Sequence, residues 1–174
     1  EMARNYSSLF LTDGTGKYLF SDLNPGDYRV RFQTPGGGYV ATTPNAGGDD
    51  AKDSDAVGGV TGIYNLESGE TDLSVDAGFY KKSGLGDYVW EDKDADGVQE
   101  AGEAPISGVT VQLLDGNGVQ IGQTTTNGVG YYEFVNLNPG DYAVRFVAPS
   151  GYVATAANQG GDDAKDSDAV GGVT

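Results

Sequence analysis

Apolar and polar residues alternate in short runs along the second half of the chain, and this pattern predicts β-strands. In residues 141–147, Tyr142, Val144 and Phe146 occupy every second position, so their side chains should share the face that packs on the core. We find no window with apolar residues at helical spacing. Strands are expected at 85–90, 108–114, 120–125, 131–134, 141–147 and 152–155, with further strands at 63–66 and 73–80.

Turn-forming pairs separate these runs. Asn117-Gly118 and Asn127-Gly128 are suited to the tight turns of hairpins, and Pro139-Gly140 is suited to a type II turn. About seven or eight short strands in about 110 residues are typical of a β-sandwich. The expected fold class is therefore all-β.

The chain repeats itself on the scale of a domain. Residues 47–61 and 160–174 are identical, and the sequence of residues 23–28 recurs at 137–142. A period of this length indicates tandem domains rather than a solenoid. We expect an incomplete repeat at 1–80 that lacks its N-terminal strand and acidic loop, a short linker at 81–84, and a repeat at 85–174 that lacks its C-terminal strands. In the alternative arrangement, a neighbouring chain supplies the missing strands.

The acidic loop at residues 92–103 reads DKDADGVQEAGE. Oxygen-bearing side chains occupy its first, third, fifth, ninth and twelfth positions and glycine its sixth, which is the ligand spacing of a calcium loop. Such loops usually join two helices, but here Trp90 ends one predicted strand and Pro105 leads to the next. The loop is therefore expected to order a crossover between β-strands.

A second acidic segment follows in each repeat. Its carboxylates are compatible either with a solvated loop, the usual reading of a charge run, or with a further calcium site. Flanking glycines, the preference for Asp over Glu and the position inside a predicted folded unit favour calcium. The candidate ligands are Asp162, Asp163, Asp166 and Asp168, and their first-repeat counterparts Asp49, Asp50, Asp53 and Asp55.

Composition narrows the chemistry. The 174 residues include no cysteine and no histidine, and the net charge is −16. Disulfides, thiol catalysis and most transition-metal sites are therefore excluded, and ten scattered Lys and Arg residues argue against nucleic acid. No run approaches the roughly 18 apolar residues of a membrane-spanning helix. Hard oxygen ligands remain, and Ca²⁺ is the expected cofactor.

The motifs GDYVWEDKDADGVQEAGE, GVTVQLL, NGVGYYEF, LNPGDYAVRF, GGDDAKDSDA and DAGFY resemble the SdrD B-like domains of serine-aspartate repeat adhesins, which are related to collagen-adhesin B-type repeats. The resemblance implies tandem immunoglobulin-like (prealbumin/Cna-B-like) β-sandwiches with calcium-binding loops, secreted and held at the cell surface. By the same resemblance, Asp92, Asp94, Asp96 and Glu103 would bind calcium with the Val98 carbonyl, and the Asp-rich segments would add ligands. The lysines of the second repeat, Lys93 and Lys165, lie in acidic loops, so no isopeptide crosslink is expected.

The leading functional hypothesis is a non-enzymatic, calcium-rigidified structural repeat of an adhesin, stalk or extracellular filament. Its expected partners are calcium ions, adjacent like repeats and other copies of the chain in a filament. The alternative is a carbohydrate- or protein-binding module, in which exposed tyrosines would contact the ligand, or an accessory domain of a large secreted protein. Catalysis by paired carboxylates is disfavoured because calcium loops explain those carboxylates and no pocket-forming insertion interrupts the strands.

Overall fold

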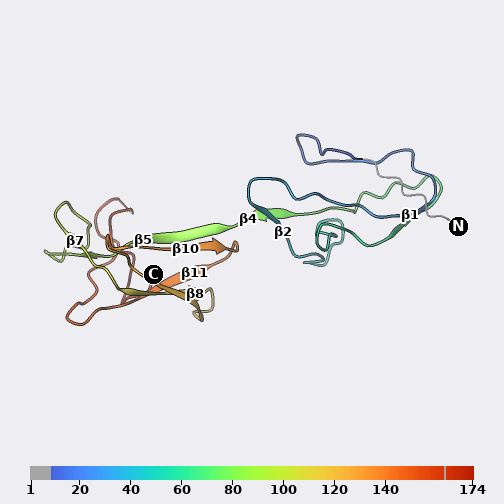
Figure 1. The fold of residues 1–174 in the computed structure, drawn as a ribbon. Helices are drawn as coiled ribbons and strands as arrows, with labels where there is room; N and C mark the ends of the chain where they lie inside the picture. The colour runs from blue at the N-terminus through green and yellow to red at the C-terminus, as the bar shows by residue number, and fades with distance from the viewer. Residues whose placement is uncertain (1–8, 163) are drawn as a thin grey trace. The chain divides into compact units, whose positions relative to one another are not determined.

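The computed structural model describes residues 9–162 and 164–174. The described residues form β-strands and loops and no helix, which confirms the all-β prediction (Figure 1). The strands are β1 (Gly26–Tyr28), β2 (Tyr39–Ala41), β3 (Tyr64–Leu66), β4 (Phe79–Lys81), β5 (Ser83–Tyr88), β6 (Trp90–Glu91), β7 (Ala104–Pro105), β8 (Thr110–Asp115), β9 (Gln120–Thr125), β10 (Tyr131–Leu137) and β11 (Tyr142–Val147).

The chain divides into two compact units. Unit 1 contains residues 1–35 and 41–79, and unit 2 contains residues 36–40 and 80–174. In the described parts of both units, no helix is long and apolar enough to cross a membrane.

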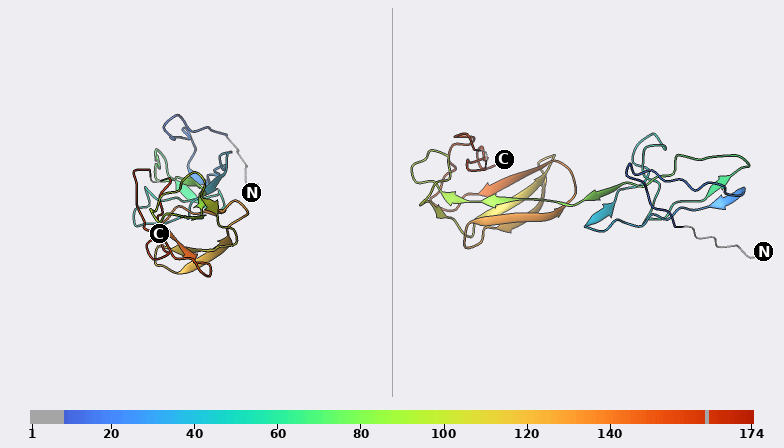
Figure 2. Two further views of the ribbon diagram at one scale, coloured as in Figure 1. Left: turned by 90° about the vertical axis from the view of Figure 1, so that its left-hand side faces the viewer. Right: turned by 90° about the horizontal axis from the view of Figure 1, so that it is seen from above.

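Unit 2 is a sandwich of two antiparallel sheets. One sheet has the order β11-β8-β9, the other pairs β10 with β5, and β6 pairs with β7. The two layers are visible in the right-hand view of Figure 2. The core between them contains Val111 from β8, Tyr132 from β10 and Val144 from β11, with Phe134 and Phe146 packed against it. The predicted sandwich is therefore present in this unit.

The alternation along β11 gives the predicted core face. Val144 is 1% exposed, Phe146 packs on the core, and the half-buried Tyr142 donates its hydroxyl to the Asn138 carbonyl at 2.9 Å. Arg145 between them is exposed. The period of two in the sequence thus sets which side of the strand is buried.

The hairpin between β8 and β9 is held by one carboxylate. Asp115 Oδ1 accepts hydrogen bonds from the N–H groups of Asn117 and Val119, both at 2.9 Å, and Gly118 has a positive φ of 78°. The hydrogen bond from the Val119 N–H is the largest of the causes that lower the pKa of Asp115. The turn therefore depends on the ionised side chain.

Unit 1 contains fewer strands than unit 2. Its strands β1 and β3 pair with each other. β2 pairs with β4, and most residues of these two strands are assigned to unit 2. Residues 17–23 correspond in sequence to β10 but form no strand. The partner of β10 is β5, and residues 9–79 hold no counterpart of β5. Without that partner the segment has no ladder to join.

Two predicted strands differ from the structure. Residues 73–80 were expected to be extended throughout, but only Phe79–Lys81 is a strand. Residues 152–155 form no strand, whereas their first-repeat counterpart contributes β2, which pairs with β4. Among the described residues after 155, none corresponds to β4, so this segment has no strand to pair with. The strands also extend into the expected linker, since β5 begins at Ser83.

Candidate metal centres

Backbone hydrogen bonds shape the loop at residues 92–103. Asp92 accepts from the Ala95 N–H at 2.7 Å through Oδ1 and from the Gly97 N–H at 2.9 Å through Oδ2. Ala95 and Gly97 both have positive φ, 62° and 85°, and this conformation is uncommon for a residue with a side chain. The loop is therefore wound tightly around its first carboxylate.

Three predicted ligands meet in this loop. Asp92, Asp94 and Asp96 each offer a carboxylate oxygen, and these oxygens all lie within 4.8 Å of one another. The close spacing of these negative charges also affects Glu100. Coulombic repulsion, mainly from Asp96 and then from Asp94, raises the pKa of Glu100. A bound cation would relieve this repulsion.

Glu103 closes the loop instead of joining these three carboxylates. Its Oε1 accepts from the Lys93 N–H and its Oε2 from the Glu100 N–H, both at 2.9 Å. Each carboxylate oxygen has a second lone pair, so this capping role leaves coordination open. The predicted roles of Glu103 and of the Val98 carbonyl as ligands stay predictions.

The second acidic segment of unit 2 is latched onto this loop. The Gln99 N–H donates to the Lys165 carbonyl at 2.5 Å, and the Ser167 N–H donates to the Gly97 carbonyl at 3.0 Å. Between these bonds, Val98 and Asp166 form an antiparallel bridge. The two acidic stretches that the sequence shows separately therefore belong to one structure, which we call the acidic latch (residues 92–103, 158–162 and 164–168).

Thr155 is a contributor that sequence reasoning missed. Its hydroxyl donates to Asp92 Oδ2 at 2.5 Å, and this bond is the largest cause that lowers the pKa of Asp92. The bond favours the ionised form of Asp92 and fixes its orientation. The only signal in the sequence was that Tyr-Val-Ala-Thr occurs in both repeats.

One carboxylate oxygen in each repeat is buried without a partner. Among the described residues, Asp53 Oδ1 and Asp166 Oδ1 have no hydrogen bond, and the two residues occupy equivalent positions in the identical stretches 47–61 and 160–174. A buried charged oxygen without a partner costs free energy unless it coordinates a metal. Asp166 also lines the same cavity as Asp92.

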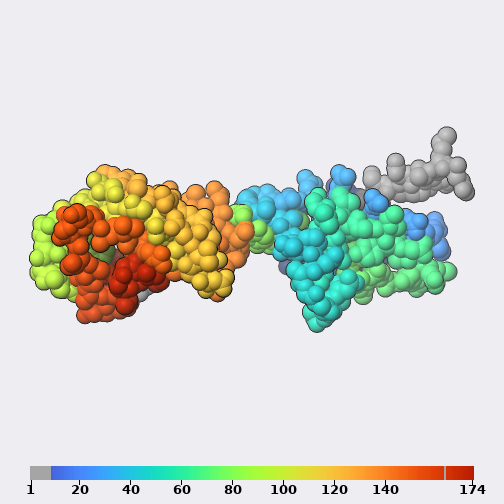
Figure 3. All heavy atoms as spheres, turned by 90° about the horizontal axis from the view of Figure 1, so that it is seen from below, coloured from blue at the N-terminus to red at the C-terminus, as the bar shows by residue number. Residues whose placement is uncertain are grey.

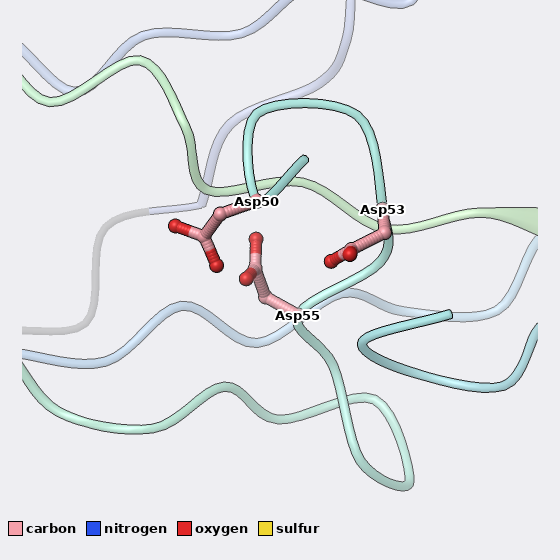
Figure 4. A group of neighbouring side chains, drawn as sticks. All are labelled: Asp50, Asp53 and Asp55. Carbon is pink, nitrogen blue, oxygen red and sulfur yellow. The ribbon is translucent and has the colours of Figure 1, made fainter. Parts of the chain in front are cut away.

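Unit 1 has its own group of three carboxylates. Oxygens of Asp50, Asp53 and Asp55 all lie within 4.8 Å of one another, and Figure 4 shows the three side chains gathered around a common centre. Asp55 Oδ2 also accepts from the Asp76 N–H at 2.7 Å. Burial, followed by repulsion from Asp55 and Asp53, raises the pKa of Asp76. Asp76 is thus a further acidic neighbour that the sequence did not place here.

The remaining predicted ligands lie elsewhere or are not described. Asp49 pairs with Lys52, and Asp162 pairs with Lys165 at 3.5 Å; these two carboxylates face lysines. Asp168 lines the cavity that contains Asp166. Asp163, the counterpart of Asp50, lies outside the described residues.

Oxygen donors at these spacings fit Ca²⁺. Calcium binds oxygen at about 2.3–2.6 Å, so ligands on opposite sides of an ion are roughly 4.6–5.2 Å apart. Oxygens within 4.8 Å of one another can therefore share one ion. The buried Asp53 and Asp166 oxygens accept no hydrogen bond, so their lone pairs are available to a cation.

Comparison with known proteins agrees with the resemblance in the sequence. The model of the SdrD B-like domain matches residues 3–79 and 83–174. Serine-aspartate repeat-containing protein F of Staphylococcus epidermidis is 45% identical over 160 residues, which are 91% of this chain and 9% of that protein. Serine-aspartate repeat-containing protein D of Staphylococcus aureus strain Newman is 46% identical over 158 residues, which are 90% of this chain and 12% of that protein.

The chain thus spans about a tenth of the length of these relatives. The family model covers almost all of this sequence in two successive matches, and the repeated motifs lie within them. The chain belongs to the SdrD B-like domain family.

Proposed function

We propose that this chain is a non-enzymatic structural segment of a secreted, cell-surface adhesin or stalk, and that Ca²⁺ stiffens each of its repeats. The observation that carries the proposal is the pair of buried, unpartnered carboxylate oxygens of Asp53 and Asp166. They occupy the same position in two repeats, and in the first repeat Asp53 belongs to a group of three converging carboxylates.

Calcium suits these sites better than magnesium. Magnesium demands near-ideal octahedral geometry at about 2.0–2.1 Å and retains several waters, whereas calcium accepts irregular sets of carboxylate and carbonyl oxygens. A net charge of −16 also opposes the compact state through self-repulsion. Binding of divalent cations among the aspartates offsets part of that repulsion.

Calcium would stiffen the acidic latch because its oxygen ligands are assembled only in the folded chain. Mass action then stabilises the folded state by about 2.7 kcal/mol per site when calcium is held at 100 times its dissociation constant. Domains are typically stable by only about 5–15 kcal/mol. One bound ion per acidic latch would therefore shift the equilibrium toward the state in which the second acidic segment is docked on the loop at residues 92–103.

Family membership supports the cellular role. The relatives are serine-aspartate repeat-containing proteins of Staphylococcus, and a cell-surface location agrees with that membership. We infer that the partners are calcium ions, adjacent like repeats and other copies of the chain. The carboxylates are accounted for by turn formation and by the proposed metal sites, so they require no catalytic role.

The test is calorimetric titration of the chelator-treated chain with calcium chloride, together with thermal melts in calcium and in chelator. Saturable binding and a higher Tm in calcium are expected. Asp94→Asn should weaken binding, because it replaces one of the three carboxylates of the loop with a neutral amide. Asp22→Asn is the control, since it removes an equal charge at an exposed position remote from the acidic stretches in sequence. Absence of binding at several-millimolar calcium, with identical melts in both media, would refute the proposal.

A further inference from the structure

The outer face of the sheet formed by β5 and β10 carries two tyrosines side by side. Tyr88 and Tyr131 are paired directly across the two strands, and their ring centroids lie 5.2 Å apart with the planes at 56°. Tyr132, the next residue along β10, belongs to the core and lines the cavity that Figure 3 shows as a hollow among orange and red atoms. Because successive residues of a strand point to opposite faces, Tyr131 points away from the core, and Tyr88 is 45% exposed.

The repeat in unit 1 shows that this face of the sheet is a solvent face. Lys17 and Leu19 stand there at the positions of Tyr131 and Glu133, and both are exposed although unit 1 contains residues 62–79. Those residues therefore pack elsewhere in the repeat. The aromatic and acidic side chains on this face are specific to unit 2.

A carboxylate lies beside the two rings. The Tyr131 hydroxyl donates to Glu133 Oε2 at 3.1 Å, and this bond is the largest cause that raises the pKa of Tyr131. Glu133 stands opposite Gly86, where a Cβ would come within 2.8 Å of the Glu133 Cβ, so no side chain covers the carboxylate from that strand. Within the described residues Glu133 forms no ion pair. We call Tyr88, Tyr131 and Glu133 the tyrosine face.

Two other tyrosines of unit 2 are each covered by a cation of the chain itself. Lys81 Nζ lies 4.8 Å from the centre of the Tyr39 ring, and Lys82 Nζ lies 5.6 Å from the centre of the Tyr80 ring. These are the lysines over tyrosine rings in the part of the chain that the structure describes. The tyrosine face thus combines two π-systems and an unpaired carboxylate with no cation of its own.

We propose that the tyrosine face binds an arginine side chain of another protein. A guanidinium stacks on an aromatic ring through its plane and donates to a carboxylate through its edge. On this face it would stack on the tyrosine pair and donate to Glu133, whose Oε1 is free of hydrogen bonds from described residues. This binding role comes in addition to the proposed structural role and does not depend on calcium.

Charge and shape both select arginine. A net charge of −16 attracts basic partners and repels acidic ones such as nucleic acids and acidic polysaccharides. The lysine ammonium is a compact and strongly hydrated charge, whereas the guanidinium is planar, weakly hydrated and able to reach both oxygens of a carboxylate. One exposed contact of this kind is weak, so the partner that suits the face is an arginine-rich segment.

The test titrates the full chain with a hexapeptide of alternating Arg and Gly, and with the same peptide carrying Lys for Arg, in calcium and in chelator. Backbone amide NMR shifts locate the binding site. Saturable shifts are expected at residues 86–88 and 131–133, with tighter binding of the Arg peptide. Tyr88→Ala and Glu133→Gln should each weaken this binding about 2- to 5-fold, the effect of losing one exposed cation–π contact or ion pair.

Matched variants separate recognition from general charge attraction. Tyr152→Ala is the control for Tyr88→Ala, because Tyr152 is 43% exposed in the same unit and lies outside the tyrosine face. Asp141→Asn is the control for Glu133→Gln, because it removes an equal charge at an exposed position. Both controls should leave the affinity for the Arg peptide nearly unchanged. Tyr88→Phe keeps the ring and should retain binding, and the amide spectrum of each variant reports whether it is folded.

Each contrary result has a defined meaning. Shifts confined to the acidic stretches and unaffected by Tyr88→Ala would show charge attraction alone and overturn the site, as would the absence of binding. Equal affinities for the two peptides would overturn the choice of arginine. Binding of a glucosamine oligomer but of neither peptide would identify a cationic sugar and overturn the choice of a protein. Melts that do not respond to calcium would refute the calcium proposal and leave this site standing.

Discussion

The substitution Asp166→Asn should change stability in opposite directions with and without calcium. Asp166 Oδ1 is buried and has no partner among the described residues. In chelator this oxygen carries a desolvation cost of about 1–3 kcal/mol, and asparagine removes the charge. In calcium the same oxygen becomes a ligand, and replacing the carboxylate with a neutral amide weakens the site.

The magnitudes follow from these two terms. In chelator the variant should gain on the order of 1 kcal/mol, which raises Tm by about 4–8 °C in a domain of this size. In calcium at 100 times the dissociation constant, loss of the site should cost up to about 2.7 kcal/mol, and Tm should fall by about 10–20 °C.

Differential scanning calorimetry in both media measures these shifts. Asp141→Asn is the matched control, because it removes an equal charge from the same unit at an exposed carboxylate outside both acidic stretches. The control should shift Tm little in either medium. If Asp166→Asn shifts Tm equally in calcium and in chelator, or if the control behaves in the same way, Asp166 is not a calcium ligand.

Two further substitutions test the local structure. Gly97→Ala should lower the urea midpoint in proportion to a loss of about 1–3 kcal/mol in stability, because a Cβ would clash with the Ala156 carbonyl oxygen. Gly102 also has a positive φ, but nothing lies within 4 Å of a Cβ there, so Gly102→Ala should cost less. Equal effects of the two substitutions would refute the close approach at Gly97. Asp115→Ala should destabilise the chain at pH 7 but not at pH 2. The Val119 N–H is the main cause that lowers the folded-state pKa of Asp115, and a folded-state pKa below the unfolded value of about 3.9 gives stability that is present above that value and lost as pH falls. Urea melts that show the same loss of stability at both pH values would contradict this prediction.

Local patterns predicted the strands that pair with sequence neighbours. The expected strand at 120–125 coincides with β9, and the expected strand at 141–147 lies within one residue of β11. Both belong to a sheet whose members lie close together in the sequence and alternate clearly. The prediction of a strand at residues 152–155 was wrong because a strand needs a partner, and alternation within one segment does not show whether that partner is present.

Contacts across long sequence separations were not predictable. Each acidic segment was recognised by its own spacing, but nothing in either one indicated that Gln99 would bond to Lys165 or that Thr155 would bond to Asp92. Glu103 shows the same limit, because its position in the loop motif suits a ligand but does not reveal that its carboxylate accepts hydrogen bonds from the Lys93 and Glu100 N–H groups. One-dimensional spacing identifies candidate donors, and tertiary pairing decides what each donor contacts.

The acidic latch ties Gln99 to Lys165 in a chain without cysteine. It closes a long loop, as a disulfide would, and closing a long loop removes much conformational freedom from the unfolded chain. With calcium bound as proposed, the stability of this closed loop would depend on the external calcium concentration and not on the redox potential. The folded unit would then keep this closure in oxidants and reductants alike, while removal of divalent ions would loosen it reversibly.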